Sequence, residues 1–70
     1  MRATSADRLD LERVIGELPA GFRHVLILHD VEGYTHDEIA TLLDIVPGTS
    51  KSQLARARSA VRRALGRKED

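Results

Sequence analysis

The chain has 70 residues, of which 41% are hydrophobic and 3% aromatic, which indicates one small domain with an aliphatic core. It contains no cysteine, which excludes disulfides and thiolate metal sites. The longest apolar run, residues 25–28, is too short for a membrane span or a signal-peptide core, so we expect a cytoplasmic protein. The net charge is zero but unevenly placed: residues 1–44 hold four Arg against nine Asp or Glu, net −5, and residues 45–70 hold seven Lys or Arg against two acids, net +5. Only the second part is therefore expected to meet phosphates.

Two helices are expected before residue 34. The first runs from about Ser5 to Leu18, and its apolar residues recur at helical spacing: Leu9, Leu11, Val14, Ile15 and Leu18. Pro19 ends it and can start a second helix over residues 20–31. That helix is apolar nearly all round, through Phe22, Val25, Leu26, Ile27, Leu28 and Val31, and should be the buried centre of a bundle. Gly33 then supplies the stop.

A third helix begins at a capping box. Thr35 and Glu38 stand three residues apart, so each side chain can accept a hydrogen bond from the other residue's backbone N–H. The residues that follow are expected to form a buried apolar stripe: Ile39, Ala40, Leu42 and Leu43. A tight turn is expected at residues 44–46, because Pro47 suits the first position of a new helix.

The last helix is expected over about residues 47–65. Its core-facing positions are Ser50, Leu54, Ala57, Val61 and Leu65, and its opposite face is polar and basic: Lys51, Ser52, Ala55, Arg56 and Ser59. Gly48 and Thr49 lie in the first turn, where backbone and hydroxyl groups can approach a phosphate. Two helices joined by a tight turn, with a polar face on the second, form the layout of a helix-turn-helix, which lays its second helix in the DNA major groove.

We therefore predict an all-α bundle of four helices, a single domain over residues 1–70, without a β wing. Its last two helices form the helix-turn-helix at about residues 35–65. Nothing in the sequence arranges a serine beside a base and an acid, so no catalytic site is expected. The three histidines, His24, His29 and His36, lack the spacing of a helical metal pair, so neither a metal nor a cofactor is expected.

From Leu18 to Leu65 the chain resembles region 4 of the sigma-70 family of bacterial transcription initiation factors, most like the extracytoplasmic-function (ECF) group. The matching sequence segments are Leu18-Pro19, Arg23-His24-Val25-Leu26, Asp30-Val31-Glu32-Gly33-Tyr34-Thr35, Asp37-Glu38-Ile39-Ala40, Leu42-Leu43, Gly48-Thr49, Lys51-Ser52-Gln53-Leu54 and Arg56-Ala57-Arg58. The resemblance implies a nucleoid-associated domain that binds the −35 promoter element while docked on RNA polymerase through the β-subunit flap. It also implies sequestration by an anti-sigma factor.

The expected DNA-contacting residues follow from the motif and the helical face together. Base edges are expected to meet Lys51, Ser52, Ala55 and Arg56, while phosphates or the groove flanks are expected to meet Gly48, Thr49, Gln53 and Arg58. Arginine or lysine on guanine is the commonest specific contact, whereas Ala55 can at best meet a thymine methyl. Readout should therefore rest on Lys51 and Arg56.

Three residues depart from the family pattern. Asp44 stands at the turn position that the family usually fills with glycine, so an aspartate is expected in the left-handed region. Ser50 replaces a core-facing valine, so its hydroxyl is expected to bond to a carbonyl of the preceding turn, and Ser50→Val is expected to stabilise the domain by on the order of 1 kcal/mol. Gln53 replaces an arginine and removes one charge beside the groove.

Two other interpretations remain open. A LuxR-type response-regulator output domain has a similar capping box and recognition-helix start. The segments Asp30-Val31-Glu32-Gly33 and Leu18-Pro19 nevertheless favour the sigma-70 family. A protein-interaction module could instead use the basic last helix to meet an acidic partner. The chain also has no region resembling the part of sigma factors that melts DNA, so we expect it to be a piece of a longer protein.

Overall fold

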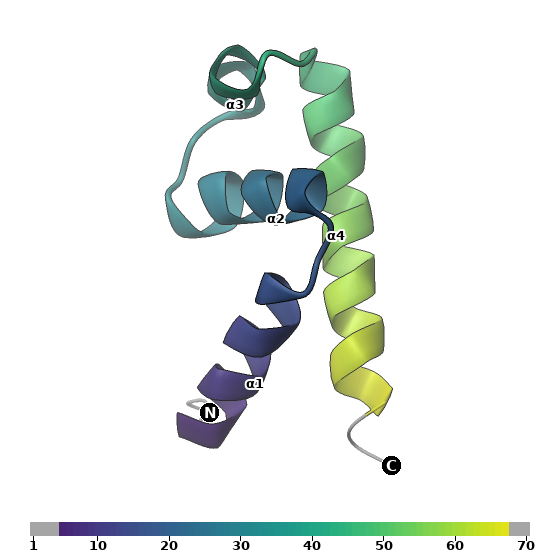
Figure 1. The fold of residues 1–70 in the computed structure, drawn as a ribbon. Coiled ribbons are helices and arrows are strands. Elements are labelled where there is room, and N and C mark those ends of the chain that lie inside the picture. Colours follow the sequence, from purple (N-terminus) through teal and green to yellow (C-terminus); the bar gives the residue numbers. More distant parts are fainter. Residues whose placement is uncertain (1–4, 68–70) are drawn as a thin grey trace.

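The computed structural model describes residues 5–67, with side chains over residues 8–66, and this part of the chain is built of helices without strands. The helices are α1 (Ser5–Gly16), α2 (Ala20–Leu26), α3 (His36–Leu43) and α4 (Pro47–Arg67). α2 continues directly into a π-helical segment, η1 (Ile27–Val31). Figure 1 shows the long α4 along one side of the molecule, with the other three helices arranged beside it. The all-α class with a C-terminal helix-turn-helix is thus confirmed.

The corner between α1 and α2 is closed by an arginine. α1 ends at Gly16, two residues before the expected end, and Pro19 caps the start of α2. The Arg23 guanidinium donates to the carbonyls of Gly16 at 3.1 Å and Leu18 at 3.2 Å. Because the last carbonyls of a helix have no partners within it, these bonds satisfy the end of α1 and fix the angle of the corner.

The core lies where α2 and α3 pack against α4. Its buried hydrophobic residues are Val14, Leu18, Val25, Leu26, Ile39, Ala40, Leu54 and Ala57. Val25 and Leu26 bear out α2 as the central helix, but Val31, expected to be buried, is 69% exposed. In a π turn each backbone N–H donates to the carbonyl five residues back instead of four. The Glu32 N–H donates in this way to the Ile27 carbonyl at 3.0 Å. The helical register therefore shifts, and Val31 is carried outward.

α3 buries a narrower stripe than its sequence predicts. Ile39 and Ala40 are buried and Leu43 is half-buried, but the prediction for Leu42 is wrong, because it is 57% exposed. α3 is two turns long, and its core-facing side runs through Ile39 and Leu43, four residues apart. Leu42 lies at the edge of that side and instead borders a surface hollow with Tyr34.

The capping box and the turn form as expected. Glu38 N–H donates to the Thr35 hydroxyl at 3.1 Å, and Thr35 N–H donates to the Glu38 carboxylate at 2.9 Å. Asp44 ends α3 with φ 58° and ψ 48°, the left-handed conformation expected at this turn, and Ile45 N–H donates to the Ala40 carbonyl at 3.0 Å. This reversal lets α4 start at Pro47 and cross α3.

Candidate nucleic-acid interface

The exposed side of α4 carries the candidate interface. Leu54 and Ala57 turn toward the core, so helical spacing places the opposite side along Ser52, Ala55, Arg56, Ser59 and Arg63. Ser52, Ala55, Arg56 and Arg63 are exposed, and Lys51 is exposed at one edge. No acidic residue occurs in α4. We call the set Lys51, Ser52, Ala55, Arg56, Ser59 and Arg63 the basic face; its charge has the sign that attracts phosphate.

The first turn of α4 lies at the tip of the helix-turn-helix. Gly48 is exposed and Thr49 is half-buried, and the Ser52 hydroxyl donates to the Thr49 carbonyl at 3.2 Å. The first N–H groups of a helix sit at the positive end of its dipole, although the Thr49 N–H here already donates to the Val46 carbonyl at 3.0 Å. Gly48 and Thr49 therefore stand at the end of the helix that favours an anion.

Gln53 lies between the basic face and α2. A Cβ atom added at Gly21 would stand 3.4 Å from the Gln53 side-chain amide, so Gln53 already packs over α2 at that point. Its side chain is half-buried. The structure thus places Gln53 at the flank of the basic face rather than on it.

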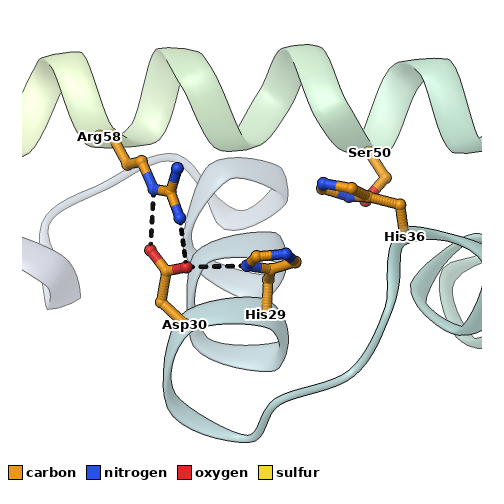
Figure 2. Close-up of polar contacts among 5 residues, drawn as sticks. All are labelled: His29, Asp30, His36, Ser50 and Arg58. Atoms are coloured by element: carbon orange, nitrogen blue, oxygen red, sulfur yellow. Dashed lines mark hydrogen bonds and ion pairs between the residues drawn. The ribbon is translucent and has the colours of Figure 1, made fainter.

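Arg58 already has a strong partner. Its Nε and Nη2 donate to the two carboxylate oxygens of Asp30 in η1, at 3.0 and 2.6 Å (Figure 2). This two-pronged pairing holds the pKa of Asp30 below its usual value, chiefly through the hydrogen bond from Arg58, and raises the pKa of Arg58. A phosphate contact by Arg58 would have to compete with Asp30. The sequence placed Arg58 among the DNA contacts and gave no sign of this partner.

Ser50 faces the core, as its spacing predicts, and it is fully buried. The expectation that its hydroxyl bonds to a carbonyl of the preceding turn is wrong: its Oγ lies 2.7 Å from Nδ1 of His36, the first residue of α3. Figure 2 shows the two side chains meeting between α3 and α4. The pair needs a histidine and a serine on different helices, and spacing along one helix could not reveal it.

A second histidine completes this cluster. The rings of His29 and His36 stack with centroids 4.6 Å apart and planes 20° from parallel, and His29 Nδ1 lies 2.8 Å from the Asp30 carboxylate. The pKa of His36 is lowered, mainly because burial disfavours its charged form, and further by the positive charges of His29, Lys51 and Arg58, with Asp37 opposing. The ring of His36 therefore favours its neutral form near neutral pH.

An apolar groove lies on another side of α4. It has a volume of about 450 Å³ and is lined from α1, α2, η1 and the second half of α4 by Leu11, Ile15, Leu26, Asp30, Val31, Arg58, Val61, Arg62 and Leu65. We call it the α1–α4 groove. Its lining is largely aliphatic and includes the Asp30–Arg58 ion pair. An aliphatic lining suits an apolar segment of another protein more than a nucleic acid.

Across residues 5–67, no group of three or more His, Asp or Glu side chains is arranged to hold a metal ion. Nor does this part of the chain contain a helix long and apolar enough to cross a membrane.

Comparison with known proteins assigns the fold to a family. The family described as "Sigma-70, region 4" matches residues 8–61. The chain is 35% identical over 66 residues to the RNA polymerase sigma-H factor of Pseudomonas aeruginosa. The aligned stretch covers 91% of this chain and 34% of that protein. It is 34% identical over 58 residues to the ECF RNA polymerase sigma factor SigE of Mycolicibacterium smegmatis, and the alignment covers 83% of this chain and 23% of that protein. It is 37% identical over 49 residues to the ECF RNA polymerase sigma-E factor of Escherichia coli K12, and the alignment covers 70% of this chain and 26% of that protein.

The chain thus spans about a third or less of the length of these relatives. No solved structure matches it significantly.

Proposed function

Since this chain belongs to the sigma-70 region 4 family, we propose that it is the domain of a longer bacterial sigma factor that recognises the −35 promoter element. The observation that carries the proposal is the basic face of α4, which is exposed, free of acidic residues and borne by the second helix of a helix-turn-helix. A helix of this kind fits the major groove, where base edges can be read. The family match favours this role over a response-regulator output domain.

Four side chains of the basic face have roles that suit their chemistry. Lys51 and Arg56 donate to guanine edges, Ser52 can donate or accept, and Ala55 offers a methyl surface to thymine. Gly48 and Thr49 meet a phosphate at the start of α4 through backbone and hydroxyl donors. Gln53 and Arg58 lie at the flanks, and their use in binding requires release from α2 and from Asp30 respectively.

The test compares two arginines of the same face. Binding of the 70-residue chain is measured by fluorescence anisotropy on a duplex that the chain itself selects from a randomised library, and on a shuffled duplex of equal composition. Arg56→Ala should lower the discrimination between the two duplexes by roughly 1–3 kcal/mol, because a base contact is lost. Arg63→Ala should weaken binding to both alike, because a phosphate contact carries no sequence information.

Salt provides the control. Binding of the unchanged chain should weaken steeply as salt rises, since phosphate neutralisation releases counterions. A chain that selects no sequence, or an Arg56→Ala variant with unaltered discrimination, would contradict the assignment of the basic face.

Docking on RNA polymerase is the second part of the proposal. The α1–α4 groove lies on a different side of α4 from the basic face, so one domain can hold DNA and a protein together. An apolar helix, such as a tip of the polymerase β-subunit flap, could lie in an aliphatic groove of this kind. An anti-sigma factor that covers the same groove would keep the domain from polymerase.

A further inference from the structure

Arg58 lies on the same side of α4 as Lys51, but its guanidinium is bonded to another helix. Seven residues, close to two helical turns, separate the two side chains, so both project from one side of α4. Arg58 nevertheless reaches η1, where its Nε and Nη2 donate to the two carboxylate oxygens of Asp30 at 3.0 and 2.6 Å (Figure 2). It is the one paired with a carboxylate among the α4 arginines whose side chains are described: Arg56, Arg58, Arg62 and Arg63.

A DNA phosphate would bind the Arg58 guanidinium in the same way as Asp30 does. Arginine pairs with carboxylates and with phosphates through two parallel N–H···O bonds, so the two partners compete for the same N–H groups. The pair lies at the surface, with 49% of the Arg58 side chain and 30% of the Asp30 side chain exposed. A duplex on the basic face could therefore reach the guanidinium without unfolding the domain.

The carboxylate of Asp30 is held in place before Arg58 meets it. The His29 ring approaches it from the other side, with Nδ1 2.8 Å from the carboxylate, and stacks on His36 with ring centroids 4.6 Å apart. An acceptor that is already positioned loses less conformational freedom on pairing than a mobile one. Arg58 therefore gains little by exchanging Asp30 for a phosphate.

We propose that Asp30 is a positioning residue that occupies Arg58 in place of a DNA phosphate, so that α4 withholds one phosphate contact from every duplex it binds. The inference rests on the proposed function in one respect, the use of the basic face as the DNA-binding surface. It concerns the strength of binding and not the sequence that is read, because a phosphate contact carries no sequence information.

The test removes the charge of Asp30 and measures how many phosphates the domain neutralises. Affinity for the selected and the shuffled duplex is measured by fluorescence anisotropy over a range of salt concentrations at about pH 7.5, where aspartate is ionised. Asp30→Asn should raise the affinity for both duplexes roughly two- to fivefold, the size expected when a surface ion pair no longer has to be given up. The slope of log affinity against log salt should steepen by about 0.9, since one more phosphate is neutralised. The ratio of the two affinities should stay constant.

Two controls separate the release of Arg58 from the change in net charge. Glu32→Gln removes the same charge close by in the chain, and the Glu32 side chain is exposed and outside the ion pair. This variant should leave the salt slope unaltered. Asp30→Asn combined with Arg58→Ala should also show the slope of the unchanged chain, because the freed cation is then absent.

Nuclear magnetic resonance tests the same point on the unchanged chain. The Nε–H signal of Arg58 should keep its position when the selected duplex is added, since its bond to Asp30 persists. The Nε–H signal of Arg56, on the basic face, should shift. In Asp30→Asn the Arg58 signal should shift as well. The comparison of Arg58 with Arg56 involves no substitution, so it decides the question even if Asp30→Asn fails to fold.

The outcomes keep the two proposals apart. A chain that binds duplexes without selecting a sequence overturns −35 recognition and leaves the test of Asp30 in force, whereas a chain that binds no duplex overturns both. Selective binding with an Asp30→Asn variant of unaltered affinity and slope overturns this inference alone. So does an Arg58 signal that shifts when DNA is added to the unchanged chain. Equal effects of Asp30→Asn and Glu32→Gln would assign the gain to net charge and contradict the role of Asp30.

Discussion

Ser50 shows how one buried polar atom can reverse the expected effect of a substitution. Valine at this site would add apolar contacts in the core, which is why the sequence predicts stabilisation. The hydroxyl, however, is bonded to His36, a partner that is itself partly buried. Removing one partner of such a pair leaves the other without a hydrogen bond, and that cost exceeds the value of the bond itself.

We therefore expect Ser50→Val to destabilise the domain by about 1 kcal/mol at neutral pH, lowering the melting temperature by roughly 4–8 °C. The reason is that Nδ1 of His36 loses its partner between α3 and α4. Thermal unfolding of four proteins, namely the unchanged chain, Ser50→Val, His36→Ala and the double variant, forms a double-mutant cycle.

The double variant should cost at least about 0.5 kcal/mol less than the two single changes together, because the pair is broken only once. A Ser50→Val variant that melts higher than the unchanged chain would show that added packing outweighs the hydrogen bond.

The turn between α3 and α4 sets the geometry of the helix-turn-helix, and it rests on an aspartate. Asp44 adopts φ 58° and ψ 48°, where a side chain other than glycine is strained, and it ends a helix whose negative dipole end disfavours its charge. Asp44 is exposed, so a substitution there removes little packing.

Asp44→Gly should consequently stabilise the domain by about 0.5–1 kcal/mol, after allowance for the greater freedom of glycine in the unfolded chain. Asp44→Ala removes the same charge but keeps the strained backbone, so it should be less stable than the glycine variant. Urea unfolding of the three proteins measures both differences. Equal stabilities for glycine and alanine would mean that the charge, and not the backbone, dominates at this turn.

The helix-turn-helix could be predicted in detail because local signals define it. Thr35 with Glu38 marks the start of α3, and Pro47 marks the start of α4. The π-helical end of α2 carries no such signal, since no glycine or proline interrupts residues 27–31. Its register is set by packing, and Val31 was therefore misplaced.

The candidate interface also has features that could be predicted from local sequence and features that could not. The exposure of Lys51, Ser52 and Arg56 follows from helical spacing around Leu54. The contacts that restrain the interface do not, because Arg58 and Asp30 are 28 residues apart and Ser50 and His36 are 14 apart. Short-range rules on one helix cannot identify partners at such separations.

At the scale of the whole molecule, the basic face and the α1–α4 groove are the two surfaces that we propose for DNA and for polymerase. The basic face belongs to the positive half of the chain, while α1 and η1 in the acidic half supply much of the groove. The two surfaces share α4 but use different sides of it. A substitution in one should therefore leave the other working.

α1 offers a matched pair of leucines to test the groove. Leu11 is 39% exposed and lines it, whereas Leu9, on the same helix, is 64% exposed and does not. Leu11→Glu should weaken binding of the chain to purified bacterial core RNA polymerase at least about tenfold, because a charge is placed against an aliphatic surface. Leu9→Glu carries the same charge and should bind nearly as the unchanged chain does.

Both leucine variants should keep their affinity for the selected duplex. Equal losses of polymerase binding in the two would mean that added negative charge, rather than the groove, is responsible. Polymerase binding that survives Leu11→Glu would place the docking surface elsewhere on the domain.

α4 is synthesised after α1, α2 and α3, yet all three pack against it. The earlier helices on a nascent chain therefore have no surface on which to bury Val14, Val25 or Ile39 until α4 has left the ribosome. Helices this short are marginal in water without tertiary packing. The domain should consequently remain unfolded through most of its own translation and then acquire its core and its basic face in the same step.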